Sequence, residues 1–262
     1  MSEESDKKEK LLEGTLISHL LELRTRLMRS VIAIVVLFIP CAYFSNPIFD
    51  LLAGPLSERL PKGSTLIATS VMTTFTTPFK LSFMVAVFGA MPYILFELWG
   101  FIAPGLYRKE KRFAVPLLAS SILLFYVGVA FAYFFVFPMM FKFFIATTPH
   151  GVQMMPDINN YMDFALTMFL AFGIAFETPV AVVLLALTGL VSVEKIAAAR
   201  GYVIIGIFVI AGFVTPPDAL SPFMMAIPMW LLYEAGVIFA RTMTRSPKND
   251  AADEAPKDSG SA

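Results

Sequence analysis

The sequence is poor in the residue types that build most catalytic and metal centres. Among its 262 residues there are 1 cysteine and 2 histidines, and charged residues make up only 15%. The single cysteine, Cys41, excludes an intramolecular disulfide and a cysteine-based metal cluster. Soluble domains carry about 25% charged residues, so the low charge also argues against a soluble fold. The net charge of zero gives no indication of a nucleic-acid partner.

The sequence also lacks the short motifs of common enzymes. It contains no G-x-S-x-G, H-E-x-x-H or Walker A pattern. An intramembrane protease would need a nucleophile with a base, or paired aspartates, within the bilayer, and both histidines, His19 and His150, flank the apolar runs instead. We therefore predict that the protein is not an enzyme and holds no metal or cofactor.

Apolar runs long enough to cross a bilayer fill most of the chain. Hydrophobic residues make up 57% of the sequence and the mean hydropathy is +0.73. A helix that crosses a bilayer core needs about 20 consecutive apolar residues, and the chain contains several runs of about this length. We predict an all-α integral membrane protein with a six-span domain at residues 14–240, a disordered N-terminus at 1–13 and a disordered tail at 241–262. The predicted spans are about 27–44, 79–101, 113–144, 161–190, 201–214 and 219–240.

Prolines divide and bend these spans. The sequence TPPD at residues 215–218 splits the last apolar stretch, because two adjacent prolines do not fit inside one straight helix. The helix at 201–214 would then be roughly 21 Å long, too short for a bilayer core of about 30 Å. Pro92 is expected to interrupt the second span. Together these features predict a kinked, concave bundle whose fifth and sixth helices are short.

Basic residues are distributed very unevenly between the two sides of the predicted membrane domain. Of the 20 lysines and arginines, sixteen fall on one side, and the other side has only Arg59, Lys62, Lys80 and Lys142. Because cytoplasmic loops are enriched in Lys and Arg, both termini are predicted to lie in the cytoplasm.

Glu22, Arg24 and Arg26 precede the first span on an amphipathic segment at residues 15–29. The simplest interpretation is that the arginines enforce topology and touch anionic lipid, while Glu22 and Arg26, four residues apart, form a pair. A role in ligand binding is the alternative.

Two further acids are candidates. Topology explains the basic residues around Glu110 but not the acid itself, which either neutralises its neighbours or accepts hydrogen bonds from a cationic ligand. Glu177 lies deep in the fourth span, where an ionisable group is costly. It lines a functional or hydrated site, or it is a protonated packing residue close to Pro179. Glu97, near the end of span two, is less informative because its side chain can reach the interface.

Four segments of the chain together resemble the TatC family, the multi-spanning subunit of the twin-arginine protein translocase. They are HLLELRTRL at 19–27, FIAPGLY at 101–107, FGIAFETP at 172–179 and TPPD at 215–218. They occur in the family's order over about residues 15–240. Each alone would be weak evidence, but together they are specific.

The resemblance implies a receptor on the cytoplasmic face of the bacterial inner membrane. TatC-like proteins bind the twin-arginine signal peptides of folded cargo and act with the single-span proteins TatB and TatA, in a homo-oligomeric TatBC complex driven by the proton-motive force. Family knowledge points to signal-peptide binding by Glu110, Glu22, Arg24, Arg26, Phe101 and Leu106, and to functional roles for Pro55, Glu177 and Asp218. The alternative class is a secondary transporter or channel for a small solute, which would also explain Glu177 and the kinked helices.

Overall fold

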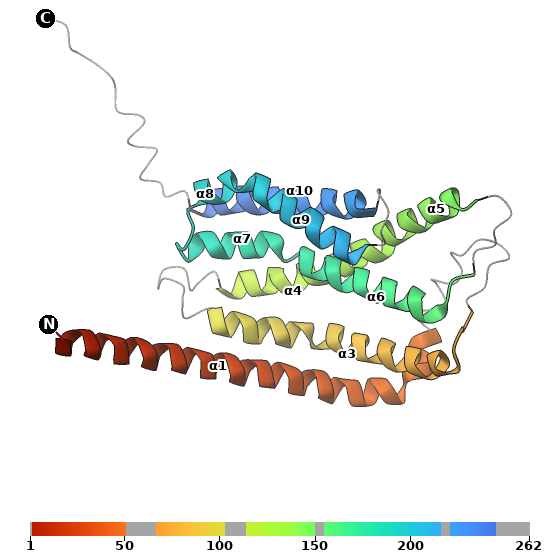
Figure 1. Cartoon of the computed structure of the whole chain (residues 1–262), viewed down its shortest axis with the longest axis horizontal. Coiled ribbons are helices and arrows are strands. Elements are labelled where there is room, and N and C mark those ends of the chain that lie inside the picture. The colour runs from red at the N-terminus through yellow and green to blue at the C-terminus, as the bar shows by residue number, and fades with distance from the viewer. Residues whose placement is uncertain (1, 51–66, 103–113, 150–154, 216–220, 245–262) are drawn as a thin grey trace, which may run out of the picture. The chain divides into compact units, whose positions relative to one another are not determined.

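The computed structural model describes residues 2–50, 67–102, 114–149, 155–215 and 221–244 (Figure 1). The chain divides into two compact units, Met1–Ile174 and Ala175–Ala262. Within the described ranges the regular structure is helical apart from one isolated bridge between Ile67 and Asp157. This confirms the predicted all-α class, which follows from apolar runs that satisfy their backbone groups within each helix.

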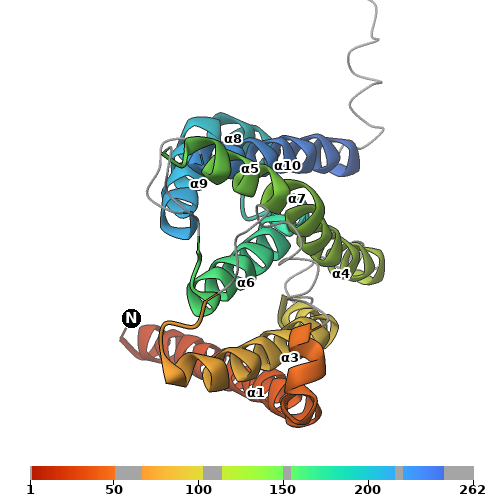
Figure 2. The same cartoon turned by 90° about the vertical axis from the view of Figure 1, so that its right-hand side faces the viewer.

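The first unit contains a long antiparallel pair of helices, α1 (Ser2–Tyr43) and α3 (Val71–Ile102). They lie side by side in both Figure 1 and Figure 2. Phe38 and Phe83 make an edge-to-face contact with ring centroids 5.8 Å apart. α1 is one continuous helix, so the segment at 15–29 is part of it. It begins at Ser2, whereas the sequence predicted disorder over 1–13; the Glu and Lys residues there have high helix propensity.

Helix α3 continues through Pro92, so the predicted interruption of the second span at this residue is wrong. Proline has no backbone N–H, so Pro92 cannot donate the helical hydrogen bond to the carbonyl four residues earlier, which is that of Phe88. The hydroxyl of Tyr126 donates to that Phe88 oxygen at 2.8 Å. A neighbouring helix thus satisfies the carbonyl, and α3 remains unbroken.

The predicted third span consists of α4 (Ala114–Phe131), a π-helical turn η3 (Ala132–Val136) and α5 (Phe137–Thr147). Phe137 donates its backbone N–H to Ala132, five residues earlier, immediately before Pro138. α6 (Ile158–Ala175) completes the unit. Its core is aromatic, with Phe125 and Phe172 fully buried. An apolar cavity of about 370 Å³ lies among α3, α4, η3 and α6.

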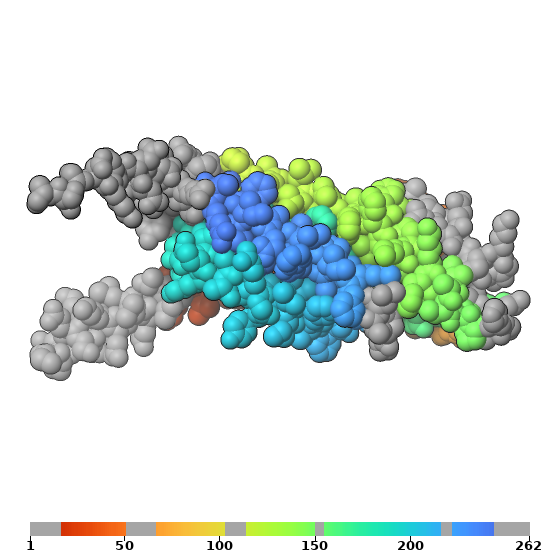
Figure 3. All heavy atoms as spheres, turned by 90° about the horizontal axis from the view of Figure 1, so that it is seen from above, coloured from red at the N-terminus to blue at the C-terminus, as the bar shows by residue number. Residues whose placement is uncertain are grey.

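The second unit is built around α10 (Ser221–Thr244), which packs on α7 (Thr178–Leu187) and α9 (Arg200–Val214). The short helix α8 (Val193–Ala198) follows a turn in which Gly189 has a φ of 67°, a conformation that favours glycine. Figure 3 shows α9 and α10 as adjacent cyan and blue surfaces. A Cβ on Gly236 would lie 2.8 Å from the backbone of Pro179, so a glycine permits the close packing of α10 on α7.

Among the residues that the structure describes, five helical segments are long and apolar enough to cross a membrane: Ile17–Tyr43, Val71–Ile102, Ala114–Thr147, Ile158–Leu187 and Pro222–Met243. The helix Arg200–Val214 is apolar but has only 15 residues, roughly 22 Å. It matches the predicted short fifth helix. α10 has 24 residues, or about 36 Å, so the prediction of a short last helix is wrong. Its helix continues four residues beyond the predicted boundary at 240, through Arg241 to Thr244.

Candidate functional site

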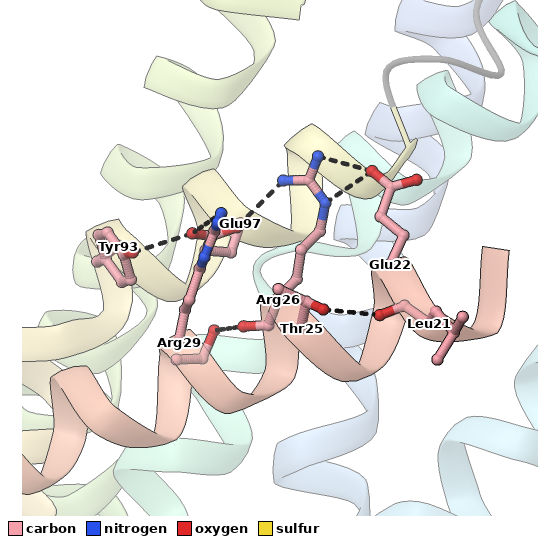
Figure 4. A network of polar contacts seen from close by, with 8 residues as sticks. Leu21, Glu22, Thr25, Arg26, Arg29, Tyr93 and Glu97 are labelled. Atoms are coloured by element: carbon pink, nitrogen blue, oxygen red, sulfur yellow. Dashed lines mark hydrogen bonds and ion pairs between the residues drawn. The ribbon is translucent and has the colours of Figure 1, made fainter. Parts of the chain in front are cut away.

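A cluster of charged side chains joins α1 to α3 close to the C-terminal end of α3 (Figure 4). Glu22 and Arg26 of α1 and Glu97 of α3 belong to it. The guanidinium of Arg26 donates from Nε and Nη2 to Glu22 Oε1, at 3.0 and 2.8 Å. Its third nitrogen, Nη1, donates to Glu97 Oε2 at 3.1 Å. One turn of α1 thus holds an acid and a base four residues apart, as the sequence predicted, and the base also reaches a second acid on α3.

Glu97 is the buried centre of this cluster. Only 3% of the residue is exposed. Its carboxylate accepts a hydrogen bond from the Tyr93 hydroxyl at 2.9 Å and lies 3.7 Å from Arg29 Nη1. A buried charge of this kind is tolerated only when it is paired and hydrogen-bonded. The two arginines of α1 supply this pairing, so the cluster links α1 to α3.

The sequence-based prediction missed Glu97, because an acid near a span end was expected to reach the interface. Two signals could have identified it. Consecutive antiparallel spans bring the start of the first, with Arg26 and Arg29, beside the end of the second. In addition, Tyr93 precedes Glu97 by four residues, on the same helical face.

Two features close the cluster at the end of α3. A Cβ on Gly100 would overlap Arg26 Nη1, so the absence of a side chain there leaves room for the guanidinium. One residue further on, the ring of Phe101 stacks on His19 of α1, with centroids 4.2 Å apart and planes at 20°. Phe101 therefore presents a half-covered apolar surface beside the charged groups.

Arg24 differs from Arg26. It is exposed and has no ion-pair partner within the part of the chain that the structure describes. With Leu21, Thr25, Met28 and Arg29 it lines a hollow of about 300 Å³ on the surface of α1. The two arginines therefore differ: Arg26 is paired with Glu22 and Glu97, whereas the Arg24 side chain is exposed on the surface of α1.

Four of the predicted site residues, Glu110, Leu106, Pro55 and Asp218, lie outside the described residues. Those that the structure describes in its first unit, Glu22, Arg26 and Phe101, come together with Glu97 at one end of the α1–α3 pair, and Arg24 lies on the outer surface of α1 there. Their roles in ligand binding stay predictions.

Glu177 lies at the break between α6 and α7, not inside a continuous helix. It is the N-cap residue of α7, with Pro179 in the first turn, and it is half-buried. Pro179 cannot donate to the carbonyl of Ala175, and α6 ends at that residue. The membrane-length segment Ile158–Leu187 thus contains a local break in its regular helix at Glu177. The two roles predicted for Glu177, in function or in packing, stay predictions.

A second polar cluster lies at the N-terminus of α6. Asp157 Oδ2 accepts hydrogen bonds from the hydroxyl and the backbone N–H of Thr69, at 2.6 and 3.0 Å. Asp157 Oδ1 accepts from the backbone N–H groups of Asn159 and Asn160, which caps the helix. These bonds, that of the Thr69 hydroxyl foremost, lower the pKa of Asp157 to about 2. Nearby, Lys80 on α3 pairs with Asp163 at 2.7 Å.

In the second unit one ion pair joins α9 to α10. Arg200 donates from Nε and Nη2 to the two oxygens of Glu234, at 2.6 and 2.9 Å. The adjacent Tyr233 hydroxyl donates to the backbone oxygen of Ile196 in α8. Among the described residues no three His, Cys, Asp or Glu side chains lie together in a way that could hold a metal ion.

Comparison with known proteins supplies the family. A family model described as Sec-independent protein translocase protein (TatC) matches residues 18–228. The chain is 53% identical over 241 residues to the TatC protein of Azotobacter chroococcum mcd 1, covering 92% of this chain and 94% of the relative. It is 50% identical over 234 residues to that of Escherichia coli K12, covering 89% and 91%.

Solved structures agree with the sequence relatives. A crystal structure of the twin-arginine translocase receptor TatC is similar with a TM-score of 0.78 and 38% identity, covering 87% of this chain and 100% of that one. A second, determined in the detergent DDM, has a TM-score of 0.76 and 36% identity, covering 85% and 99%.

Proposed function

The chain belongs to the TatC family of Sec-independent protein translocase proteins, and on that premise we propose that it is the receptor core of a twin-arginine translocase. As a member of this family it is a multi-pass membrane component of a transport system and not an enzyme. Membership favours this function over that of a transporter or channel for a small solute.

The proposed ligand is a signal peptide that carries two adjacent arginines and an apolar stretch. The observation that carries the proposal is the position of Glu22. Its side chain is 38% exposed, and within the described residues its Oε2 accepts no hydrogen bond, so a carboxylate oxygen is available to an arginine. The stacked rings of His19 and Phe101 offer apolar surface beside the C-terminal end of α3.

We propose that further residues of the chain contribute to peptide binding. Leu106 and Glu110 follow the end of α3 by four and eight residues in the sequence. We propose that Glu110 binds the arginine pair together with Glu22 and that Leu106 adds apolar contact. Arg24 and Arg26 would lower the affinity for cationic peptides that lack the correct arrangement, because like charges in an interface disfavour the wrong partner.

The proposed setting is the bacterial inner membrane with both termini in the cytoplasm. The uneven distribution of Lys and Arg supports this orientation. The proposed partners are the single-span proteins TatB and TatA, in a complex that contains several copies of this chain. The proton-motive force would drive export of folded cargo. The short helix Arg200–Val214 supports a docking role for α9 and α10, because its ends need cover from thinned lipid or another helix.

Peptide crosslinking tests the proposed site. Full-length protein in native membranes would be exposed to a photo-crosslinking peptide with an arginine pair and to a matched peptide with a lysine pair. Glu110→Gln and Glu22→Gln should each weaken crosslinking of the arginine peptide and leave the weak signal of the lysine peptide unchanged. Unchanged crosslinking of the arginine peptide in both variants would refute the site.

Export assays test the residues outside the binding surface. Glu177→Ala should reduce export of a folded reporter while peptide crosslinking stays normal, because Glu177 is proposed to act in docking or passage. Pro55 and Asp218 variants should likewise affect assembly or export more than peptide binding. Normal export in Glu177→Ala would assign this residue to packing, and solute flux through liposomes containing this chain alone would favour the transporter.

A further inference from the structure

Arg26 binds two carboxylates at once, and the two differ in exposure. Two of its three hydrogen bonds go to Glu22, whose side chain is 38% exposed. The third goes to Glu97, whose side chain is 4% exposed. By these exposed fractions a ligand can reach Glu22 but not Glu97. Figure 4 shows the guanidinium of Arg26 between the two acids.

The cluster is electrically balanced without any ligand. Glu22 and Glu97 contribute two negative charges, and Arg26 and Arg29 contribute two positive ones. The guanidinium of Arg26 thus occupies the same acid that a ligand arginine would use. For an arginine of the ligand to bind both carboxylate oxygens of Glu22 without competition, Arg26 must give up its two hydrogen bonds to Glu22.

We propose that Glu97 is a positioning residue that controls the availability of Glu22: it retains Arg26 when an arginine of the ligand takes Glu22. This inference rests on the proposed function, because it takes a twin-arginine peptide as the ligand. Glu97 suits the role because Tyr93 and Arg29 hold its carboxylate in place independently of Arg26.

The physical reason lies in the cost of an unpaired guanidinium. Hydrogen bonds to charged groups are stronger than those between neutral groups, and a partly buried charge left without a partner is costly. With Glu97 present, Arg26 can leave Glu22 and still have a carboxylate. Without Glu97, Glu22 is its last acidic partner among the described residues, and Arg26 competes more strongly with the ligand.

A binding cycle between two residues tests this. Full-length protein in lipid nanodiscs would be titrated with a fluorescent synthetic peptide carrying an arginine pair and an apolar stretch. Glu97→Gln should raise the Kd roughly three- to tenfold, which corresponds to about 0.7–1.4 kcal/mol. Arg26→Gln should lower the Kd by a similar factor, because it frees Glu22. The double variant should bind like Arg26→Gln alone.

Gly100→Ala provides an independent perturbation with no change of charge. Its new Cβ would overlap Arg26 Nη1, the nitrogen that bonds to Glu97. Alanine also has the higher helix propensity, so the helix itself should remain stable. Gly100→Ala should raise the Kd in the same direction as Glu97→Gln, and should have no effect when Arg26 is already Gln.

Several results would overturn the inference. A weaker peptide affinity in Arg26→Gln would make Arg26 a direct ligand contact, and an effect of Glu97→Gln that persists in the Arg26→Gln background would mean that Glu97 does not act through Arg26. Thermal unfolding of each variant controls for loss of the fold. If the unmodified protein binds the arginine peptide no better than a lysine-pair peptide, the proposed function fails. If it discriminates but the cycle is additive, only this inference fails.

Discussion

Replacing Glu97 by Gln should measurably loosen the packing of α1 on α3. The substitution keeps the shape of the side chain but removes the charge from a residue that is 3% exposed and contacts Arg26, Arg29 and Tyr93. The amide oxygen of Gln can still accept a hydrogen bond. Its NH₂ group is a donor only, so it cannot pair with the arginine side chain that the second carboxylate oxygen contacts.

The magnitude follows from the exposure of the partners. Breaking a fully buried ion pair by removing one partner costs about 3–5 kcal/mol. Here the cations are less confined, since the side chains of Arg26 and Arg29 are 23% and 57% exposed and can turn toward headgroups or water. We therefore expect a loss of about 2 kcal/mol in the free energy of unfolding, between the values for buried and surface pairs.

The assay is equilibrium unfolding in mixed micelles, with thermal unfolding in nanodiscs as a check. Glu22→Gln is the matched control, because it makes the same chemical change in the same cluster at an acid whose side chain is 38% exposed. Exposed pairs four residues apart on a helix contribute only about 0.3–0.5 kcal/mol. Equal effects of the two substitutions would refute the reasoning, since Glu97 would then be no more important for stability than a surface acid.

Three further predictions concern packing, backbone pairing and pH. Gly236→Ala should cost roughly 1–3 kcal/mol, because its Cβ would lie 2.8 Å from a backbone atom of α7, whereas Gly206→Ala, with no atom within 4 Å, should be neutral or stabilising in the same unfolding assay. Tyr126→Phe should cost roughly 1–2 kcal/mol by leaving a carbonyl of α3 unpaired; melts matching those of the unmodified protein would contradict this. The pKa of Asp157 is lowered from 3.8 to about 2, so its stabilising contact with Thr69 should be complete above pH 3.8 and lost as the pH falls through about 2. An NMR titration of that carboxyl measures this, and a midpoint near 3.8 would contradict it.

Much of the fold could be predicted from local sequence. Apolar runs of span length predict the helices because a bilayer leaves no other way to satisfy the backbone, and the fifth helix, predicted at 201–214, is found at Arg200–Val214. The effect of individual prolines could not be predicted in this way. Pro92 leaves α3 intact because Tyr126, 38 residues away from Phe88, replaces the lost donor, whereas the helix does end at Ala175, four residues before Pro179.

The sequence by itself determined the class of protein and the family, because these depend on composition, on short motifs and on their order along the chain. Only the tertiary structure decided which charged side chains meet. Glu22 and Arg26 are neighbours on one helix and pair as their spacing predicts, but Glu97 lies 71 residues from Arg26. Its burial and its two arginine partners arise from the antiparallel packing of α1 on α3, whereas its third partner, Tyr93, is a neighbour on the same helix. No local pattern encodes that packing.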